Sequence, residues 1–217
     1  MSIIPDAGAR PAERLAAGLR RLQLDLDRDR QARLLAYLEL LGRWNRVYNL
    51  VARAPPLVWV ARHLLDSLAV LPYLTGASCA DLGTGAGLPG IPLAIAAPTR
   101  RWYLVDSNAK KQRFVREAIR VLALDGVSAI HCRIEEWHPA ERPDAAIARA
   151  LAAPLKVLAA ARRLLAAGVP LYLMLGPAGR PALHDLPAGY RLRHLHPLEV
   201  PYLDGRRYLA IIENEVK

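Results

Sequence analysis

The stretch of the chain most suited to chemistry is DLGTGAGLPG, residues 81–90. A short apolar run precedes it, and residues 91–97 after it can form a helix. Glycines adopt positive φ angles and leave room for a ligand against the backbone, while a helix N-terminus offers free N–H donors. This stretch therefore predicts a ligand-binding turn between a strand and a helix.

Two ligands compete for this turn. Residues 85–90 match G-x-G-x-x-G, a weak dinucleotide pattern, whereas residues 81–87 match D-x-G-x-G-x-G, the first motif of S-adenosylmethionine (SAM) methyltransferases. Asp81 would repel a pyrophosphate but suits SAM, which carries a sulfonium and an ammonium. Asp106 ends the next apolar run and is expected to hold ribose hydroxyls with either ligand. We predict cofactor contacts from Asp81, Gly83, Gly85, Gly87 and Asp106.

The composition is that of a globular protein. The chain has 217 residues, enough for one sizeable domain and a small appendage, and 53% of them are hydrophobic. We expect no membrane span and no secretory segment, and two distant cysteines, Cys79 and Cys132, are expected to be free thiols. These features predict a cytoplasmic protein.

The net charge of +10 comes almost entirely from arginine, since the only lysines are Lys110, Lys111, Lys156 and Lys217. Such a balance favours a polyanionic partner, and the planar guanidinium suits phosphates and stacking on bases. A solvated basic surface is the alternative. Charge alone does not distinguish RNA from DNA.

Hydrophobic periodicity predicts an α/β fold. Residues 1–73 are expected to form an N-terminal helical extension packed on the core, with a loose tail at residues 1–7. Residues 74–217 alternate between strands and helices as a SAM-dependent methyltransferase domain. The order implies a Rossmann-like, mostly parallel sheet with its ligand at the carboxyl ends of the strands, completed by a C-terminal antiparallel hairpin. We expect helices at 9–23, 28–46, 57–72, 89–97, 108–123 and 154–167, and strands at 78–82, 101–105, 127–133, 144–149, 169–175, 190–196 and 206–213.

Short motifs from residue 44 to residue 150 accompany the glycine-rich stretch. They are Trp44-Asn45-x-x-Tyr48-Asn49-Leu50, Arg62-His63-x-x-Asp66-Ser67, Gly87-Leu88-Pro89-Gly90-Ile91-Pro92, Asp106-Ser107-x-x-Lys110, Arg133-x-Glu135-Glu136 and Arg149-Ala150. With these motifs the chain resembles, over nearly its full length, the bacterial 16S ribosomal RNA (guanine-N7) methyltransferase family, also called glucose-inhibited division protein B.

The resemblance implies an activity and a set of site residues. The activity is SAM-dependent methyl transfer to guanine N7 in small-subunit ribosomal RNA, or in the 30S subunit. Gly83 and Leu88 would line the SAM site, Ile134 and Glu135 would lie near the adenine, and Arg149 would border the cofactor. The family usually has a lysine where this chain has Leu175, so the RNA contact passes to another basic residue such as Arg180 or is lost.

Guanine N7 carries an in-plane lone pair, so the reaction requires no general base. His63 and Asp66 lie three residues apart on one helical face and are candidates for a catalytic pair, although we favour a role in holding the helix by hydrogen bonds. His194 and His196 lack the further ligands of a metal site, so we predict no metal.

Two other classes of function remain open. One is a nicotinamide-dependent oxidoreductase, and the other is a non-catalytic RNA-binding scaffold. The residues do not reveal which guanine is modified or whether free RNA or the assembled subunit is the substrate. Nothing in the sequence demands more than a monomer.

Overall fold

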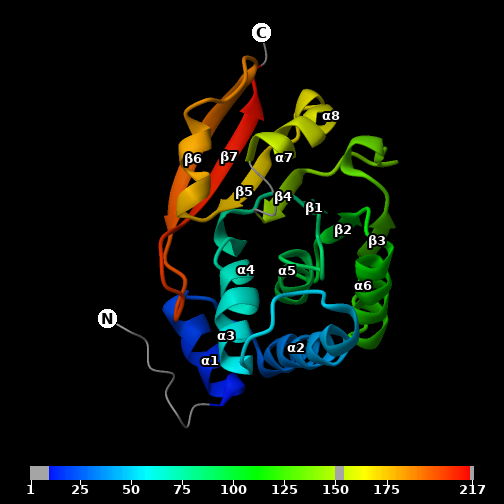
Figure 1. Cartoon of the computed structure of the whole chain (residues 1–217), viewed down its shortest axis with the longest axis vertical. Coiled ribbons are helices and arrows are strands. Elements are labelled where there is room, and N and C mark those ends of the chain that lie inside the picture. Colours follow the sequence, from blue (N-terminus) through cyan, green and yellow to red (C-terminus); the bar gives the residue numbers. More distant parts are fainter. Residues whose placement is uncertain (1–9, 150–153, 216–217) are drawn as a thin grey trace.

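A seven-stranded sheet organises the chain in the computed structural model, which describes residues 10–149 and 154–215. Its order is β3-β2-β1-β4-β5-β7-β6, and Figure 1 shows these strands from β3 on the right to β6 on the left. The first five are parallel, and β7 pairs antiparallel with both β5 and β6. The strands are β1 (Ser78–Leu82), β2 (Arg101–Asp106), β3 (Val127–His131), β4 (Ala145–Arg149), β5 (Leu171–Leu175), β6 (Tyr190–Leu198) and β7 (Arg207–Asn214).

Helices cover both faces of the sheet, because alternate residues of the strands pack into two hydrophobic clusters. Along β5, Tyr172 and Met174 belong to one cluster, and Leu171, Leu173 and Leu175 belong to the other. The first cluster joins the sheet to α1, α2, α5 and α6 and to the helical segment before β1. The second joins it to α7 and α8. The helices are α1 (Pro11–Arg21), α2 (Arg28–Tyr48), α3 (Pro56–Trp59), α4 (Asp66–Leu68), α5 (Gly90–Ala96), α6 (Ala109–Val121), α7 (Pro154–Ala160) and α8 (Arg162–Ala166).

The predicted α/β class, the parallel sheet and the antiparallel hairpin are confirmed. Asp27 caps the N-terminus of α2, because its carboxylate accepts a hydrogen bond of 2.8 Å from the amide of Arg30. Strand β5 begins two residues later than predicted, since Pro170 has no N–H for a ladder. Strand β3 ends at His131, where the chain turns into the 3₁₀ segment η3 (Ile134–Glu136).

Two helices predicted as continuous are interrupted. The predicted helix 154–167 divides into α7 and α8 at Ala161. The predicted helix 57–72 is α3, then the π-helix η1 (Val60–Leu65), then α4, and it ends in the 3₁₀ turn η2 (Leu71–Tyr73). The amide of Asp66 donates to the carbonyl of Ala61, five residues back, which is the π pattern. Hydrophobic periodicity gives no sign of this extra residue, and π turns are frequent at functional sites.

Candidate active site

The loop between β1 and α5 is built around the Asp81 carboxylate. Asp81 is fully buried, and its Oδ2 accepts hydrogen bonds from the Thr84 hydroxyl at 2.6 Å and from the Gly90 amide at 2.8 Å. Burial raises the pKa of Asp81 to about 6, while these two hydrogen bonds act in the opposite direction. The other oxygen, Oδ1, has no hydrogen-bond partner among the described residues. Asp81 therefore fixes both ends of the loop.

The first glycines of the loop leave room beside the backbone. Gly83 has φ of +72°, and a Cβ built on it meets nothing within 4 Å. The amide of Gly85 donates to Asp106 Oδ2 at 2.8 Å, so the ends of β1 and β2 are tied together. The second oxygen of Asp106 accepts from the Asn108 amide at 2.7 Å. The two aspartates that the sequence singled out thus meet across one loop.

The remaining predicted cofactor residues lie on several elements. Leu88 is buried, Gly87 packs against Ile91, Ile134 is half-buried and Glu135 is exposed on η3 after β3. Arg149 is the last residue of β4 and is half-buried. These elements follow or end parallel strands, so they belong to the carboxyl edge of the sheet, where ligands of such sheets bind.

His63 and Asp66 do not form a pair. Both ring nitrogens of His63 are buried without a hydrogen-bond partner in the described residues, and its ring packs beside Trp59 with centroids 5.7 Å apart. Burial and the charge of Arg149 lower the pKa of His63 to about 4. Asp66 instead lies near two arginines, with 3.5 Å from Oδ2 to Arg149 Nη1 and 3.7 Å from Oδ1 to Arg207 Nε.

A cavity of about 370 Å³ opens beside Asp66, where β4 and β5 end. Burial raises the pKa of Asp66, and the neighbouring charges of Arg149 and Arg207 act in the opposite direction. Leu175, the residue that replaces the family's usual lysine, also lines this cavity. Arg180 does not line it and lies over the Tyr208 ring, 5.3 Å from the centroid. The basic residues that line this cavity together with Leu175 are Arg149 and Arg207.

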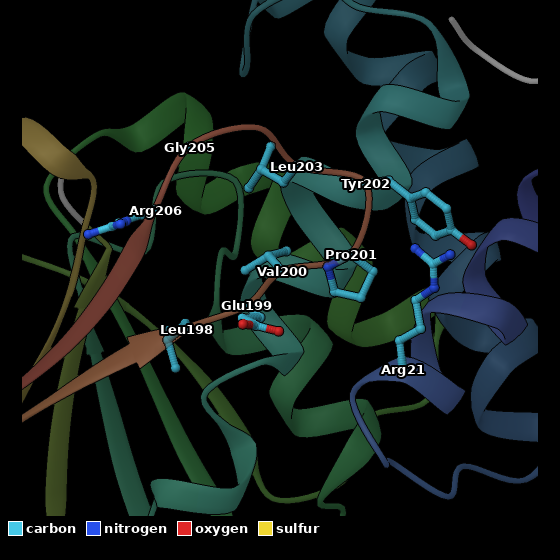
Figure 2. Close-up of a pocket in the computed structure, with 9 residues that line it drawn as sticks. All are labelled: Arg21, Leu198, Glu199, Val200, Pro201, Tyr202, Leu203, Gly205 and Arg206. Atoms are coloured by element: carbon cyan, nitrogen blue, oxygen red, sulfur yellow. The ribbon is translucent and has the colours of Figure 1, made fainter. Parts of the chain in front are cut away.

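A larger hollow of about 660 Å³ shares the lining residue Leu198 with this cavity and follows the loop between β6 and β7. Figure 2 shows Arg21 reaching from α1 to the Tyr202 ring, and Arg206 at the far end of the loop. The guanidinium carbons of Arg14 and Arg21 lie 4.7 and 4.8 Å from the centre of that ring. These cation–π contacts join α1 to the hairpin loop and place positive charge along the hollow.

Sequence reasoning missed three residues that shape this site. Tyr37, buried in α2, donates a hydrogen bond of 2.7 Å to the Ala86 carbonyl and so joins the N-terminal helices to the glycine loop. Thr84 holds Asp81, and Arg207 faces Asp66. Tyr37 fits the apolar stripe of its helix, and Arg207 begins a strand far along the chain. No sequence motif marks either residue, although Thr84 lies within the glycine-rich stretch.

In the part of the chain that the structure describes, we find no metal cluster, no membrane-spanning helix and no disulfide. There, no cluster of three or more His, Cys, Asp or Glu side chains could hold a metal ion. None of the described helices is long and apolar enough to cross a membrane. Cys79 and Cys132 are both free.

Comparison with known proteins decides the family. Residues 30–210 match the model of the GidB family, rRNA small subunit methyltransferase G. The chain belongs to this family. Ribosomal RNA small subunit methyltransferase G of Xanthomonas campestris pv. campestris is 45% identical over 211 residues, 97% of each chain. The protein of the same name from Hahella chejuensis is 42% identical over 200 residues, 92% of each chain. The resemblance that the motifs predicted is thereby confirmed.

Solved structures agree on the fold. The Bacillus subtilis tRNA methyltransferase TrmK superposes with a TM-score of 0.56 at 16% identity, over 71% of this chain and 67% of that one. A SAM-dependent methyltransferase from Aquifex aeolicus gives 0.52 at 20% identity, over 69% of this chain and 90% of that one. The fold is the Rossmann-like fold of class I SAM-dependent methyltransferases, as predicted.

Proposed function

We propose that this protein transfers a methyl group from SAM to N7 of a guanine in 16S ribosomal RNA. The observation that carries the proposal is membership of the rRNA small subunit methyltransferase G family across residues 30–210. The loop geometry supports it, because Asp81 and Asp106 converge on a glycine backbone that leaves space for a ligand. The enzyme is a cytoplasmic monomer that acts on small-subunit RNA or on the 30S subunit.

The residues present fit SAM as the cofactor. Space above Gly83 and Gly85 admits the ligand against the backbone, and Asp106 lies at the end of β2, where a carboxylate can receive ribose hydroxyls. Leu88 lines the cofactor site, Ile134 and Glu135 border the adenine, Gly87 shapes the loop, and Arg149 borders the cofactor at the end of β4. The buried Asp81 holds the loop, and its negative charge would suit the cationic groups of SAM. The cofactor supplies an electrophilic methyl group bound to a sulfonium.

The protein's part in the chemistry is alignment. N7 is nucleophilic without losing a proton, so the chain needs to hold the base and exclude water rather than supply a general base. Well-oriented reactants can lower a barrier by about 7–11 kcal/mol. The cavity of about 370 Å³ is large enough for a base, and Arg149 lines it as well as bordering the proposed cofactor site. Neither His63 nor Asp66 acts as a proton acceptor in this scheme.

RNA flanking the target guanine follows the hollow of the β6–β7 loop. Arg21 and Arg206 line that hollow, which shares the lining residue Leu198 with the cavity. Guanidinium groups suit phosphates because their donors form a planar fork. The backbone of the RNA thus runs beside α1, and the target base enters at the ends of β4 and β5.

Methyl transfer from radiolabelled SAM tests the function directly. The acceptors are 16S RNA and 30S subunits from cells that lack the native family enzyme, with material from normal cells as the control. We expect incorporation only into the unmodified acceptor. SAM binding without any incorporation would indicate an RNA-binding scaffold instead.

A thermal-shift panel tests the cofactor separately. Ligands that bind the folded state raise the melting temperature, by an amount that grows with concentration over Kd. SAM and S-adenosylhomocysteine should stabilise the protein, whereas NAD should not. Stabilisation by NAD alone would favour the oxidoreductase.

A further inference from the structure

Asp66 occupies an unusual position for a carboxylate without a proton-transfer role. It follows the π-helix η1, only 7% of its surface is exposed, and it lines the cavity at the ends of β4 and β5. The extra residue of a π turn changes the direction in which the following side chains point, and such turns are frequent at functional sites. The turn thus accompanies a carboxylate at the cavity wall.

The Asp66 carboxylate keeps oxygen lone pairs that accept no hydrogen bond from the described residues around it. Oδ1 is buried without a hydrogen-bond partner in residues 10–149 and 154–215. The contacts of 3.5 Å with Arg149 and 3.7 Å with Arg207 are ion pairs longer than ordinary hydrogen bonds. Nη1 of Arg149 donates instead to the Arg62 carbonyl, at 2.9 Å. Leaving a buried charged acceptor without a donor is costly, so a ligand with N–H groups fits here.

Guanine presents the matching pattern. Along its edge lie two acceptors, N7 and O6, followed by two donors, N1–H and the 2-amino group. A carboxylate can accept from both donors at once, and a guanidinium beside it can donate to O6. This arrangement leaves N7 free to react. Adenine has an acceptor at N1, so its lone pair would face the carboxylate and be repelled.

We propose that Asp66 selects guanine by accepting hydrogen bonds from N1–H and the 2-amino group, while Arg207 donates to O6. The assignment rests on the proposed function of the same site. Both side chains act on the base itself, and they do so from elements far apart in the chain, η1–α4 and β7. The pair explains guanine specificity without a contact that would block N7.

The test removes the 2-amino group from the substrate. After the nucleotide methylated by the wild-type enzyme has been mapped, 16S RNA is ligated with guanosine or inosine at that position. Inosine keeps N7, O6 and N1–H. Single-turnover rates at saturating SAM should fall about 10- to 100-fold on inosine for the wild-type enzyme, the value of a hydrogen bond to a charged group. Asp66→Asn should slow methylation of guanosine and bring the two rates within about threefold of each other.

Two further variants separate base recognition from structural support. Arg207→Gln should slow both substrates equally, because both retain O6. Asp144→Asn is the control, since it makes the same change at a carboxylate that accepts backbone N–H groups at the amino end of β1 and does not line the cavity. Asp144→Asn should keep the wild-type ratio of the methylation rate on guanosine to the rate on inosine. If Asp66→Asn does not fold, Asp66→Glu, which retains both acceptors, should preserve discrimination at a lower rate.

The outcomes distinguish this inference from the proposed function. If the wild-type enzyme makes no 7-methylguanosine, the proposed function is wrong. If it methylates guanosine and inosine equally, or if Asp66→Asn still discriminates against inosine as the wild type does, only the role of Asp66 is wrong. SAM affinity measured by calorimetry should be the same for wild type and Asp66→Asn.

Discussion

Two effects oppose each other at Asp81: burial disfavours its charged form, and the glycine loop relies on that carboxylate. The carboxylate is fully buried in β1, where a charge is poorly solvated, yet the loop depends on its hydrogen bonds with Thr84 and Gly90. Positive charge brought close by a ligand would relieve that conflict. A fold that keeps an ionisable group at such a place gives up stability for a preformed binding loop.

The pH dependence of stability should reveal the charge on Asp81. Its pKa of about 6 in the folded protein lies above the unfolded value of 3.8. Its contribution to stability is therefore fully present below the unfolded pKa and is lost as pH rises through 6. Asp81→Asn cannot ionise. The free energy of unfolding of Asp81→Asn minus that of the wild type should therefore rise by about 1.4 kcal/mol between about pH 5 and about pH 7.5.

Urea denaturation of both proteins across this pH range is the measurement. Asp144→Asn serves as the comparison, because hydrogen bonds from Ser78 and Ala77 lower the pKa of that exposed carboxyl. The lowered pKa keeps that carboxyl ionised in both the folded and the unfolded protein across this range, so its difference from the wild type should not change with pH. A difference between Asp81→Asn and the wild type that does not change with pH would show that Asp81 is not a buried, titrating charge.

Gly90 is required for its lack of a side chain rather than for its backbone angles. A Cβ there would lie 2.2 Å from Leu104 Cδ2 and 2.7 Å from Asp81 Oδ2. Gly90→Ala should therefore destabilise the protein by about 1–3 kcal/mol, as overpacking does. Gly42→Ala is the control, because its Cβ would meet Trp59 at an ordinary 3.5 Å and alanine favours a helix. Thermal unfolding should place the two variants on opposite sides of the wild type, and equal melting temperatures would contradict the packing argument.

At the scale of elements, sequence patterns located the strands and helices but not the irregular turns that aim side chains. The glycine-rich stretch and the alternation of apolar runs give β1 to β5 nearly residue by residue. The π turn before Asp66 leaves no trace in hydrophobic periodicity, because it depends on how the segment packs against α1. Hydrophobic periodicity also does not reveal how α2 ends: Asn45 Oδ1 accepts a hydrogen bond from the Val51 amide at 2.9 Å and closes the end of this helix.

The N-terminal helices should not be separable from the sheet. We propose that residues 1–73 are an extension that depends on the core at 74–217, and that the core depends on it equally. Leu15, Leu34 and Leu64 are fully buried in the same cluster as Trp102 and Phe114. Removing residues 1–73 would expose that apolar face, and each large core side chain lost costs about 2–5 kcal/mol.

A fragment spanning residues 74–217 tests this dependence. It should lack near-ultraviolet circular dichroism and a cooperative melting transition, and it should not bind SAM. The full chain carried through the same purification is the control. A fragment that melts cooperatively and binds SAM would show that the sheet is an independent domain.

At the scale of the whole molecule, several of the arginines lie along one path, over α1 and the β6–β7 loop. Arg14 and Arg21 on α1 converge on Tyr202, and Arg206 lies beyond them on the same loop. The net charge predicted a polyanionic partner, but the position of the basic path needed the fold. Helix α1 and the β6–β7 loop are about 180 residues apart in sequence.

RNA binding should weaken steeply with salt. Each phosphate neutralised contributes about −0.7 to −0.9 to the slope of log affinity against log salt. Arg21→Ala and Arg206→Ala should each reduce the magnitude of that slope by about one. Arg116→Ala, on α6, is the control for loss of a positive charge elsewhere. Filter binding to 16S RNA at several salt concentrations measures the slopes, and slopes unchanged by the two loop-side variants would remove the hollow from the RNA path.

The predictable part of the site is the part that follows one contiguous motif. Asp81, Gly83 and Gly85 stand in a single turn, and Asp106 ends the next strand, so their meeting follows from parallel topology. Arg207 reaches Asp66 only because β7 runs antiparallel beside β5. Contacts made by a late strand depend on register and on loop length, and neither is readable from a local pattern.

The most direct test of the account follows the methyl group to its atom. Unmodified 16S RNA is incubated with the protein and SAM bearing a CD₃ group, and the digested nucleosides are analysed by mass spectrometry. The account predicts deuterated 7-methylguanosine as the labelled product and none with Gly83→Arg, which fills the space beside the loop. Label on another base or on another atom of guanine, or undiminished label with Gly83→Arg, would contradict it.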